Sequence, residues 1–223
     1  MNTAYRHRFA DGTVSALPVG KVVCVGRNYA AHARELNNPV PAAPLLFLKP
    51  PSALTPLEQP IVLPAGRGAV HHELEIALLV GDGRQPGSVS CGPCSIAGIG
   101  LALDLTLRDL QDRLKRDGHP WDIAKGFAGA CPCSRFVPPA GIEDWRALSF
   151  ELLVNGCPRQ AGNTGDMLFS YAELLASMAF HFGLAGGDVV LTGTPPGVAA
   201  LQPGDRLLLR LGDYLEAGTR VAS

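Results

Sequence analysis

The chain has 223 residues, of which 47% are hydrophobic and 17% are charged, and its formal net charge is −1. This composition is enough for one buried core, and a near-zero charge without any basic cluster argues against nucleic acid as a partner. No apolar stretch reaches the roughly 18 residues that cross a bilayer, and Met1 to Asp11 is too polar for a secretion signal. We therefore expect a cytoplasmic protein with no membrane partner.

The predicted elements describe a β-rich chain, because Gly (26 residues) and Pro (19 residues) are abundant and helix-period runs are few. Six segments have the composition of strands: residues 21–25, 45–48, 73–80, 149–154, 188–191 and 206–211. Asn155-Gly156 predicts a hairpin turn after the fourth of them, and residues 203–205 predict a turn before the last. Three segments predict helices: residues 28–36, 105–116 and 167–182, the last after a capping stretch at 163–166.

The stretch His71-His72-Glu73-Leu74-Glu75 leads into a run of branched apolar residues that is typical of a buried strand. Side chains two positions apart in a strand point the same way, so Glu73 and Glu75 should lie side by side. Two such carboxylates repel each other and lose hydration, so one must take a proton or a cation must lie between them. The alternative is a frayed strand end with both glutamates in water.

A third carboxylate, Asp104, lies in a run over residues 96–107 that is otherwise apolar apart from Thr106. An unpaired buried charge is costly, so Asp104 needs a partner. One candidate is Arg108, four residues further on, if the chain is helical there. The other is a metal ion, and a set of oxygen ligands without Cys or His favours Mg²⁺ or Mn²⁺ over Zn²⁺.

Four of the six cysteines stand in two close pairs. Cys91-Gly-Pro-Cys94 has the spacing of a thiol redox motif but lacks the preceding apolar strand and the Trp of that motif. A zinc site that combines this pair with Cys131 and Cys133 is conceivable, although C-x-C with an intervening proline is a poor chelating loop. We favour buried or incidental thiols over both functions.

His32 and Glu35 are three residues apart in the predicted helix at 28–36, so one helical turn places them on one face. A carboxylate beside an imidazole fixes its tautomer and raises its basicity, which suits a general base near neutral pH. The alternative for this spacing alone is an exposed pair on a surface helix.

Six separate segments together resemble the fumarylacetoacetate hydrolase family, in particular its small single-domain acylpyruvases and oxaloacetate decarboxylases. The segments are residues 25–32 (VGRNYAAH), 46–50 (LFLKP), 71–75 (HHELE), 103–111 (LDLTLRDLQ), 124–127 (AKGF) and 191–198 (LTGTPPGV). The resemblance implies an α+β, β-rich fold, a mixed β-sandwich roll, that usually forms a homodimer. It covers residues 19–223 as one catalytic domain, after a short N-terminal segment at residues 1–18.

The resemblance also implies roles for ten residues. The metal ligands are Glu73, Glu75 and Asp104; the catalytic residues are His32, Glu35 and Lys125; the substrate-binding residues are Arg27, Arg108, Gln111 and Thr194. Without it, Lys125 is an ordinary loop lysine, and Thr194 lies in a turn shaped by Gly and Pro. The chain departs from the family pattern at Leu107, often Ala, and at Ala199, often Gly, so some contacts in the pocket should differ.

The implied activity is Mg²⁺- or Mn²⁺-dependent hydrolysis of the carbon–carbon bond of acylpyruvates, 2,4-dioxo acids such as fumarylpyruvate or acetylpyruvate, with release of pyruvate. Decarboxylation of oxaloacetate passes through the same enolate, which a divalent ion stabilises. The alternative within the family is an oxaloacetate keto–enol tautomerase or isomerase, in which the same residues move a proton. A non-catalytic binding protein would have lost a ligand or the base, and none of these residues is missing.

Overall fold

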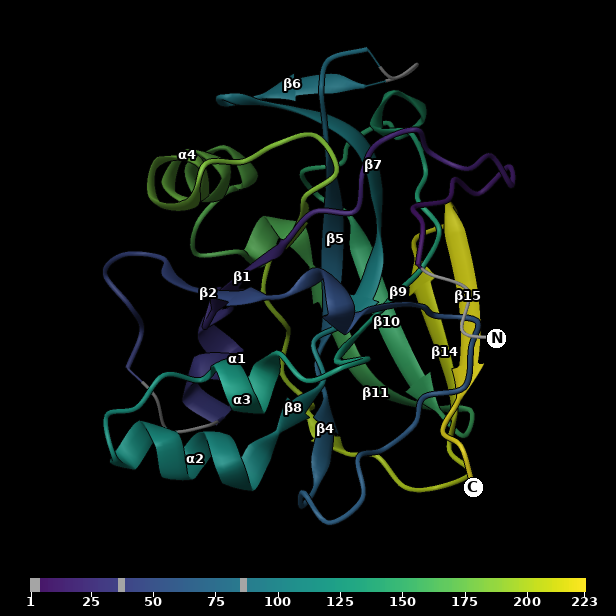
Figure 1. Cartoon of the computed structure of the whole chain (residues 1–223). Coiled ribbons are helices and arrows are strands. Elements are labelled where there is room, and N and C mark those ends of the chain that lie inside the picture. The colour runs from purple at the N-terminus through teal and green to yellow at the C-terminus, as the bar shows by residue number, and fades with distance from the viewer. Residues whose placement is uncertain (1–4, 36–38, 85–87) are drawn as a thin grey trace.

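The computed structural model describes residues 5–35, 39–84 and 88–223, which form three sheets (Figure 1). The eight-stranded sheet has the order β2-β1-β12-β5-β7-β9-β3, with β6 paired to β7. Its strands are β1 (Val22–Gly26), β2 (Leu45–Lys49), β3 (Leu54–Pro56), β5 (Leu74–Gly81), β6 (Val89–Cys91), β7 (Cys94–Leu103), β9 (Cys131–Cys133) and β12 (Val189–Leu191).

The two smaller sheets and the helices complete the fold. One sheet has the order β11 (Cys157–Asn163), β10 (Ser149–Val154), β14 (Arg206–Leu211) and β15 (Leu215–Arg220), and the other β13 (Ala199–Ala200), β4 (Val70–His72) and β8 (Thr106–Leu107). The α-helices are α1 (Ala30–Glu35), α2 (Arg108–Arg116), α3 (Asp122–Lys125) and α4 (Tyr171–Phe182). Short 3₁₀ helices are η1 (Pro51–Ala53), η2 (Pro139–Gly141) and η3 (Thr164–Asp166).

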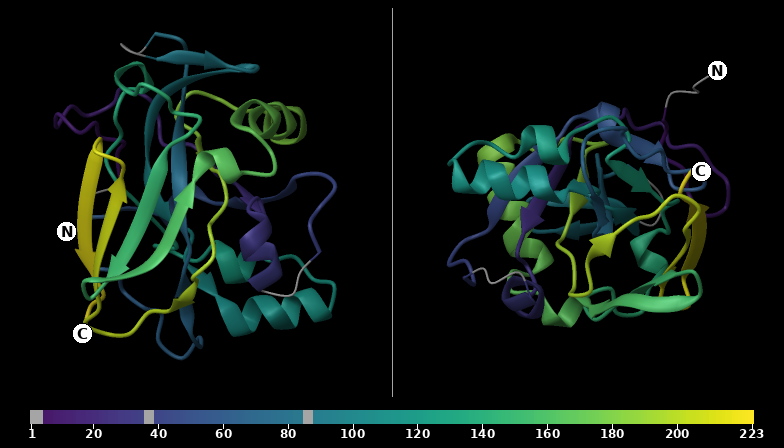
Figure 2. Two further views of the ribbon diagram at one scale, coloured as in Figure 1. Left: turned by 180° about the vertical axis from the view of Figure 1, so that it is seen from behind. Right: turned by 90° about the horizontal axis from the view of Figure 1, so that it is seen from below.

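The arrangement is a mixed, curled sheet with helices on one side and the four-stranded sheet on the other (Figures 1 and 2). β1 pairs with β12 in parallel and β3 with β9 in parallel, whereas β5 and β7 are antiparallel. Every residue of β5 is buried, as its continuous apolar sequence requires when both faces are covered. The α+β, β-rich roll expected from the sequence is therefore confirmed.

All six predicted strands are present, with ends shifted by one residue at most, and the Asn155-Gly156 hairpin joins β10 to β11. Both turn residues have positive φ, 53° and 79°, as the tightest hairpin turns require. β7 was not predicted as a strand, because its Gly- and Ala-rich run has no alternation of polar and apolar residues. It is a strand because β5 lies along its whole length.

The helix boundaries correct two predictions. α2 begins at Arg108 and not at 105, because Thr106 and Leu107 pair with β4. α4 begins at Tyr171 and not at 167: the predicted capping stretch forms η3, and the real cap is Ser170, whose hydroxyl and Glu173 form a capping box. α1 begins at Ala30, and the predicted end of that helix at residue 36 lies outside the described residues.

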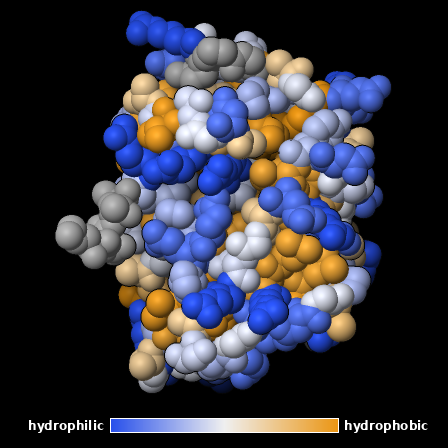
Figure 3. Space-filling model, turned by 90° about the vertical axis from the view of Figure 1, so that its right-hand side faces the viewer, coloured by the Kyte–Doolittle hydropathy of each residue, from blue (hydrophilic) through white to orange (hydrophobic). Residues whose placement is uncertain are grey.

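The outer face of the four-stranded sheet carries both apolar and charged side chains. Figure 3 shows the side of the molecule on which β15 lies, with apolar patches interspersed among polar residues. Leu208 is half-buried there, and Arg210 forms ion pairs with Glu151 and Glu216. Among the described residues, no helix is long and apolar enough to cross a membrane.

Candidate active site

Three buried carboxylates meet where β5 and β7 come together. Glu73 immediately precedes β5, Glu75 is its second residue, and Asp104 immediately follows β7. The antiparallel register pairs Leu74 with Leu103, which brings the start of β5 to the end of β7. One oxygen from each carboxylate lies within 4.8 Å of the others, and the three residues are at most 5% exposed. The two glutamates thus share a face, as their spacing predicts.

Two cations from the helices surround this cluster. Lys125 Nζ lies 2.8 Å from Glu73 Oε2 and 2.5 Å from Asp104 Oδ2, and Arg108 Nη2 donates to Glu73 Oε1. The local pairing of Arg108 with Asp104 considered from the sequence is therefore wrong: Arg108 at the start of α2 turns towards Glu73. Lys125 is the last residue of α3 and is buried, where the sequence alone suggests a solvated loop lysine.

The cluster shifts the pKa values of its two glutamates in opposite directions. Burial by itself raises the pKa of Glu73, but the adjacent Lys125 and Arg108 outweigh it and hold that pKa well below its usual value. Burial raises the pKa of Glu75 well above its usual value, and the charges of Asp104 and Glu73 raise it further. For Lys125, burial lowers the pKa, while Asp104 and Glu73 raise it above the usual value, so its ammonium stays charged.

These carboxylates fit a hard divalent cation. All the ligand atoms that the cluster offers are oxygens. Glu75 Oε2 accepts a hydrogen bond from the backbone N–H of Gly193 at 2.6 Å. Among the described residues, no cationic side chain lies within ion-pair distance of Glu75. Asp104 Oδ1 is buried and accepts no hydrogen bond of ordinary geometry, although the Lys49 ammonium lies 2.7 Å away. Bound Mg²⁺ or Mn²⁺ would offset the repulsion that raises the pKa of Glu75, and carboxylate oxygens are the donors that these ions prefer.

Lys49 is a further member of the cluster that sequence reasoning did not assign. It is the last residue of β2 and 0% exposed, and its Nζ lies 2.7 Å from Asp104 Oδ1. The same ammonium donates to the carbonyl of Ala130 at 3.0 Å and to the carbonyl of Lys125. Lys49 therefore links Asp104 to the end of α3. A lysine that directly follows the apolar run 45–48 was the available signal.

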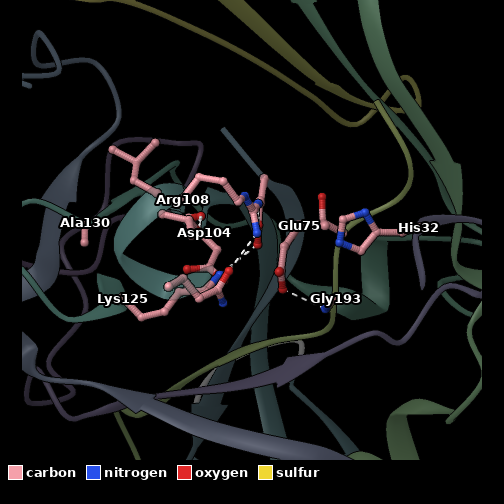
Figure 4. Close-up of polar contacts among 12 residues, drawn as sticks. His32, Glu75, Asp104, Arg108, Lys125, Ala130 and Gly193 are labelled. Atoms are coloured by element: carbon pink, nitrogen blue, oxygen red, sulfur yellow. Dashed lines mark hydrogen bonds and ion pairs between the residues drawn. The ribbon is translucent and has the colours of Figure 1, made fainter. Parts of the chain in front are cut away.

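His32 faces the carboxylates from α1 (Figure 4). His32 Nδ1 lies 3.2 Å from Glu35 Oε2, as the spacing predicts, and Glu35 Oε1 accepts the N–H of Gly197 at 2.9 Å. In Figure 4, Asp104, Arg108 and Lys125 lie on one side of Glu75 and His32 on the other. Burial lowers the pKa of His32 below its usual value, although Glu73 and Glu35 act in the opposite direction, so the imidazole is neutral at pH 7.

Thr194 enters the site in a turn over residues 193–197. Gly193 and Gly197 have φ of 98° and 100°, a region that favours glycine. A Cβ at Gly197 would also collide with the carbonyl oxygen of Arg159. Thr194 is 4% exposed, and the turn it occupies supplies the N–H groups that bind Glu75 and Glu35.

A small pocket of about 30 Å³ joins these groups, enough for one or two water-sized groups. Nine of the ten residues predicted for the site line it: Arg27, His32, Glu73, Glu75, Asp104, Arg108, Gln111, Lys125 and Thr194. The tenth, Glu35, lies behind His32. Arg108 Nη1 donates to Gln111 Oε1 at 2.7 Å, and Arg27 has φ of 62°, a costly conformation for a residue other than glycine.

Five lining residues were not assigned from the sequence, and three of them, Phe47, Trp121 and Lys115, form one wall. Phe47 and Trp121 pack with ring centroids 5.9 Å apart; Lys125 Nζ lies 5.0 Å from the Phe47 ring and Lys115 Nζ lies 5.3 Å from the Trp121 ring. Burial lowers the pKa of Lys115, and the neighbouring Arg108 lowers it further. One wall of the pocket is thus aromatic and cationic.

Comparison with known proteins agrees with this architecture. The family model described as "Fumarylacetoacetate (FAA) hydrolase C-terminal" matches residues 21–222. The chain belongs to this family. It is 47% identical to the oxaloacetate tautomerase YcgM of Escherichia coli (strain K12), over 91% of this chain and 93% of that protein. It is 41% identical to the mitochondrial oxaloacetate tautomerase FAHD1 of Homo sapiens, over 83% of this chain and 84% of that protein.

A solved structure of the family is similar over the whole chain. This is the fumarylpyruvate hydrolase from Pseudomonas aeruginosa in complex with Mn²⁺ and pyruvate, with a TM-score of 0.87, 31% identity, and coverage of 100% of this chain and 97% of that one. Family membership makes this chain one of a group of enzymes whose members include tautomerases and hydrolases.

None of the cysteines lines this pocket. All six are free thiols; Cys91 and Cys94 face each other across the β6–β7 turn, and burial raises the pKa of both. Reactive redox cysteines have lowered pKa values, so these thiols do not fit that chemistry. In the part of the chain that the structure describes, the carboxylate cluster is the one group of three or more His, Cys, Asp or Glu residues with metal-binding spacing.

Proposed function

We propose that this protein is a divalent-metal-dependent oxaloacetate keto–enol tautomerase. The observation that carries the proposal is the buried His32 imidazole, 3.2 Å from Glu35, opposite a cluster of carboxylates and cations that fits a metal ion and an anionic substrate. The tautomerases among its relatives share more of its sequence than the fumarylpyruvate hydrolase does, 47% and 41% against 31%. The similarity therefore favours the tautomerase over the acylpyruvate hydrolase that we expected first.

Glu73, Glu75 and Asp104 would hold the ion, and this oxygen-only set suits Mg²⁺ and Mn²⁺ alike. Bound there, the ion supplies positive charge that stabilises the oxygen on which negative charge develops. Lys125 adds a second positive charge at the same cluster, because its raised pKa keeps the ammonium protonated. Lys125 therefore acts through its charge, and its ammonium is too weak an acid to be the proton donor.

The proton step follows from the tautomer of His32. Because the Glu35 carboxylate accepts from Nδ1, that nitrogen carries the hydrogen and Nε2 keeps a lone pair. Nε2 takes a proton from C3 of keto-oxaloacetate, and the electron pair of the C–H bond forms the C2–C3 double bond. The resulting imidazolium returns the proton to the 2-oxo oxygen, which gives the enol. One residue thus moves one proton between two atoms of the substrate.

The remaining lining residues suit a substrate with two carboxylates. The Thr194 side chain lines the pocket and would bind the carboxylate next to the keto group. Arg27 and Lys115 carry positive charge on the pocket wall, and the nearest carboxylate to Lys115 Nζ is the exposed Asp112, 3.8 Å away. This cationic wall suits the second carboxylate of oxaloacetate better than the uncharged methyl group of acetylpyruvate.

Hydrolysis of acylpyruvates is the second candidate. The similarity in fold to a fumarylpyruvate hydrolase over 100% of the chain favours it. In that reaction His32 Nε2 would remove a proton from water, and the hydroxide would attack the distal keto carbon with loss of pyruvate. The base and the charged cluster are the same, so the two reactions differ in whether a water molecule reaches the substrate carbon.

The test compares both reactions in one preparation. Metal-stripped protein reloaded with Mg²⁺ is assayed for the enol–keto absorbance of oxaloacetate and for pyruvate release from oxaloacetate, acetylpyruvate and fumarylpyruvate. We expect a metal-dependent absorbance change that falls about 10²- to 10⁴-fold in His32→Ala, and unchanged activity in the control His181→Ala, an exposed histidine on α4. Pyruvate release without accelerated tautomerisation would overturn the proposal in favour of the hydrolase or decarboxylase.

The homodimer expected from the family stays a prediction. Light scattering of the purified protein measures it directly, and a mass of one chain would contradict it.

A further inference from the structure

Gln160 is a buried amide that lies next to the proposed site without lining its pocket. It is on β11 and 1% exposed. Its Oε1 accepts from the backbone N–H of Leu74 and from His72 Nδ1, both at 2.9 Å. Its Nε2 donates to Thr194 Oγ1 at 2.8 Å and to the carbonyl of Pro195 at 2.9 Å. All four hydrogen-bonding positions of this side chain are therefore occupied.

Two of these partners fix the orientation of the amide without any assumption about hydrogens. The N–H of Leu74 can only donate, so the atom that faces it is the amide oxygen. The carbonyl of Pro195 can only accept, so the atom that faces it is the amide nitrogen. Gln160 therefore donates to Thr194 Oγ1, and the hydroxyl oxygen of Thr194 is an acceptor in this contact.

This arrangement determines what Thr194 offers to a ligand. With its oxygen accepting from Gln160, its own hydrogen must point elsewhere, and the protein acceptor nearest to it, the carbonyl of Pro195, is at the limiting distance of 3.5 Å. We propose that Gln160 is a positioning residue that presents the Thr194 hydroxyl to the pocket as a hydrogen-bond donor. The site thereby selects a ligand oxygen that accepts, such as a carboxylate oxygen.

The same side chain connects the two parts of the pocket. Leu74, whose N–H it binds, lies between the carboxylate residues Glu73 and Glu75. Thr194, which it orients, belongs to the 193–197 turn. Gln160 thus fixes the spacing between the start of β5 and the turn, as well as the direction of one hydroxyl.

The inference deepens the proposed function and rests on it, since it assumes that Thr194 contacts a substrate carboxylate. The test uses oxalate as a non-reacting dicarboxylate and measures its affinity for the Mn²⁺-loaded protein by calorimetry. Four proteins form a cycle: the natural sequence, Thr194→Val, Gln160→Met and the double variant. Mn²⁺ affinity without oxalate and the thermal unfolding midpoint are measured for each.

We expect Thr194→Val to weaken oxalate binding by about ten- to hundredfold, because a hydrogen bond to a charged group is lost. In the Gln160→Met background the same substitution should have an effect at least about fivefold smaller, since the hydroxyl is no longer presented. Asn163→Leu is the control. Asn163 is on the same strand, and its side-chain amide donates to Ala147 and Ser149, away from the pocket. This substitution should change neither the oxalate affinity nor the effect of Thr194→Val on it.

Different outcomes overturn different statements. Equal effects of Thr194→Val in both backgrounds would overturn the positioning role of Gln160 and leave the proposed function intact. If Thr194→Val has no effect on oxalate affinity in the natural protein, Thr194 does not bind a substrate carboxylate and this inference is wrong. If the natural protein does not bind oxalate at all, the proposed function is overturned. If Gln160→Met does not fold, Gln160→Glu, which still accepts from Leu74, replaces it in the same cycle at pH 8 with the same criteria.

Discussion

The carboxylate cluster and the His32–Glu35 pair are held in different ways. Glu73, Glu75 and Asp104 lie at the ends of two long paired strands and are almost fully buried. His32 and Glu35 lie on α1, a helix of six residues, and the Glu35 side chain is 33% exposed. So short a helix has little stability of its own, so tertiary contacts such as the Glu35–Gly197 hydrogen bond must hold it in place.

This difference separates two tasks. The strands hold the charged groups in a preorganised arrangement, as metal binding requires. The pocket of about 30 Å³ is too small for a four-carbon acid, so a substrate can enter only if a wall moves. α1 is joined to the 193–197 turn by the Glu35–Gly197 hydrogen bond, and movement of this helix would break that bond without moving the strands that carry the carboxylates.

Lys49→Met tests the rigid part and should have the largest effect. Removing a buried ammonium leaves Asp104 with one cation fewer and takes one donor away from each of three backbone carbonyls. We expect a loss of about 3–5 kcal/mol in the free energy of unfolding, measured by urea denaturation, together with weaker Mn²⁺ binding. The control Arg135→Met removes an exposed ion pair with Glu58 and should cost less than about 1 kcal/mol. Equal losses would mean that Lys49 is not part of the rigid arrangement.

Glu35→Gln tests the movable part. His32 Nδ1 and the Gly197 N–H bind different oxygens of Glu35, and one of these positions becomes an NH₂ donor in glutamine, so either the tautomer or the attachment of α1 is lost. We expect kcat for tautomerisation to fall by about 10- to 100-fold, in the range reported for loss of an outer-shell partner, with unchanged Mn²⁺ affinity. Glu58→Gln, at an exposed position, is the control. A parallel loss of Mn²⁺ affinity would contradict the separation of the two tasks.

Lys115→Met addresses the cationic wall between the two parts. If this wall binds the second carboxylate, KM for oxaloacetate should rise about tenfold, while turnover of acetylpyruvate, if measurable, should not fall. Arg113→Met removes an exposed cation from the same helix and controls for net charge. The measurement is steady-state kinetics with both substrates. Equal changes in KM for oxaloacetate and acetylpyruvate would show that Lys115 does not select between them.

The smallest expected effect lies outside the site, at His7. Burial lowers the pKa of His7 below its usual value, while its Nε2 lies 3.0 Å from the carbonyl of Gly187. The unfolded chain therefore takes up the proton first, so stability is full above a pH of about 6.5 and declines as the pH falls below that value. His7→Gln should show a smaller decrease in Tm between pH 7.5 and 5.5, by a few degrees at most. Identical decreases would exclude His7 as a contributor.

The carboxylate cluster was predictable because local rules are enough to place it. Alternation along a strand puts Glu73 beside Glu75, and the cost of an unpaired charge in an apolar run requires a partner for Asp104. The α1 pair was predictable for the same reason, since helical spacing alone brings His32 to Glu35. The roles of Lys125 and Thr194 came from the family resemblance, because neither has a distinguishing local pattern.

The amino-acid sequence by itself therefore determined six of the strands, the tight hairpin and the residues that a helix or strand period places side by side. Only the tertiary structure decided that Arg108 pairs with Glu73, that Lys49 lies under Asp104, and that Gln160 orients Thr194. These contacts join residues 34 to 55 positions apart along the chain, and they depend on which strands pair. The period of a helix or strand relates only residues a few positions apart, so it cannot predict these long-range contacts. Once the sheet has formed, a buried polar group must find a hydrogen-bonding partner nearby, and few partners are within reach.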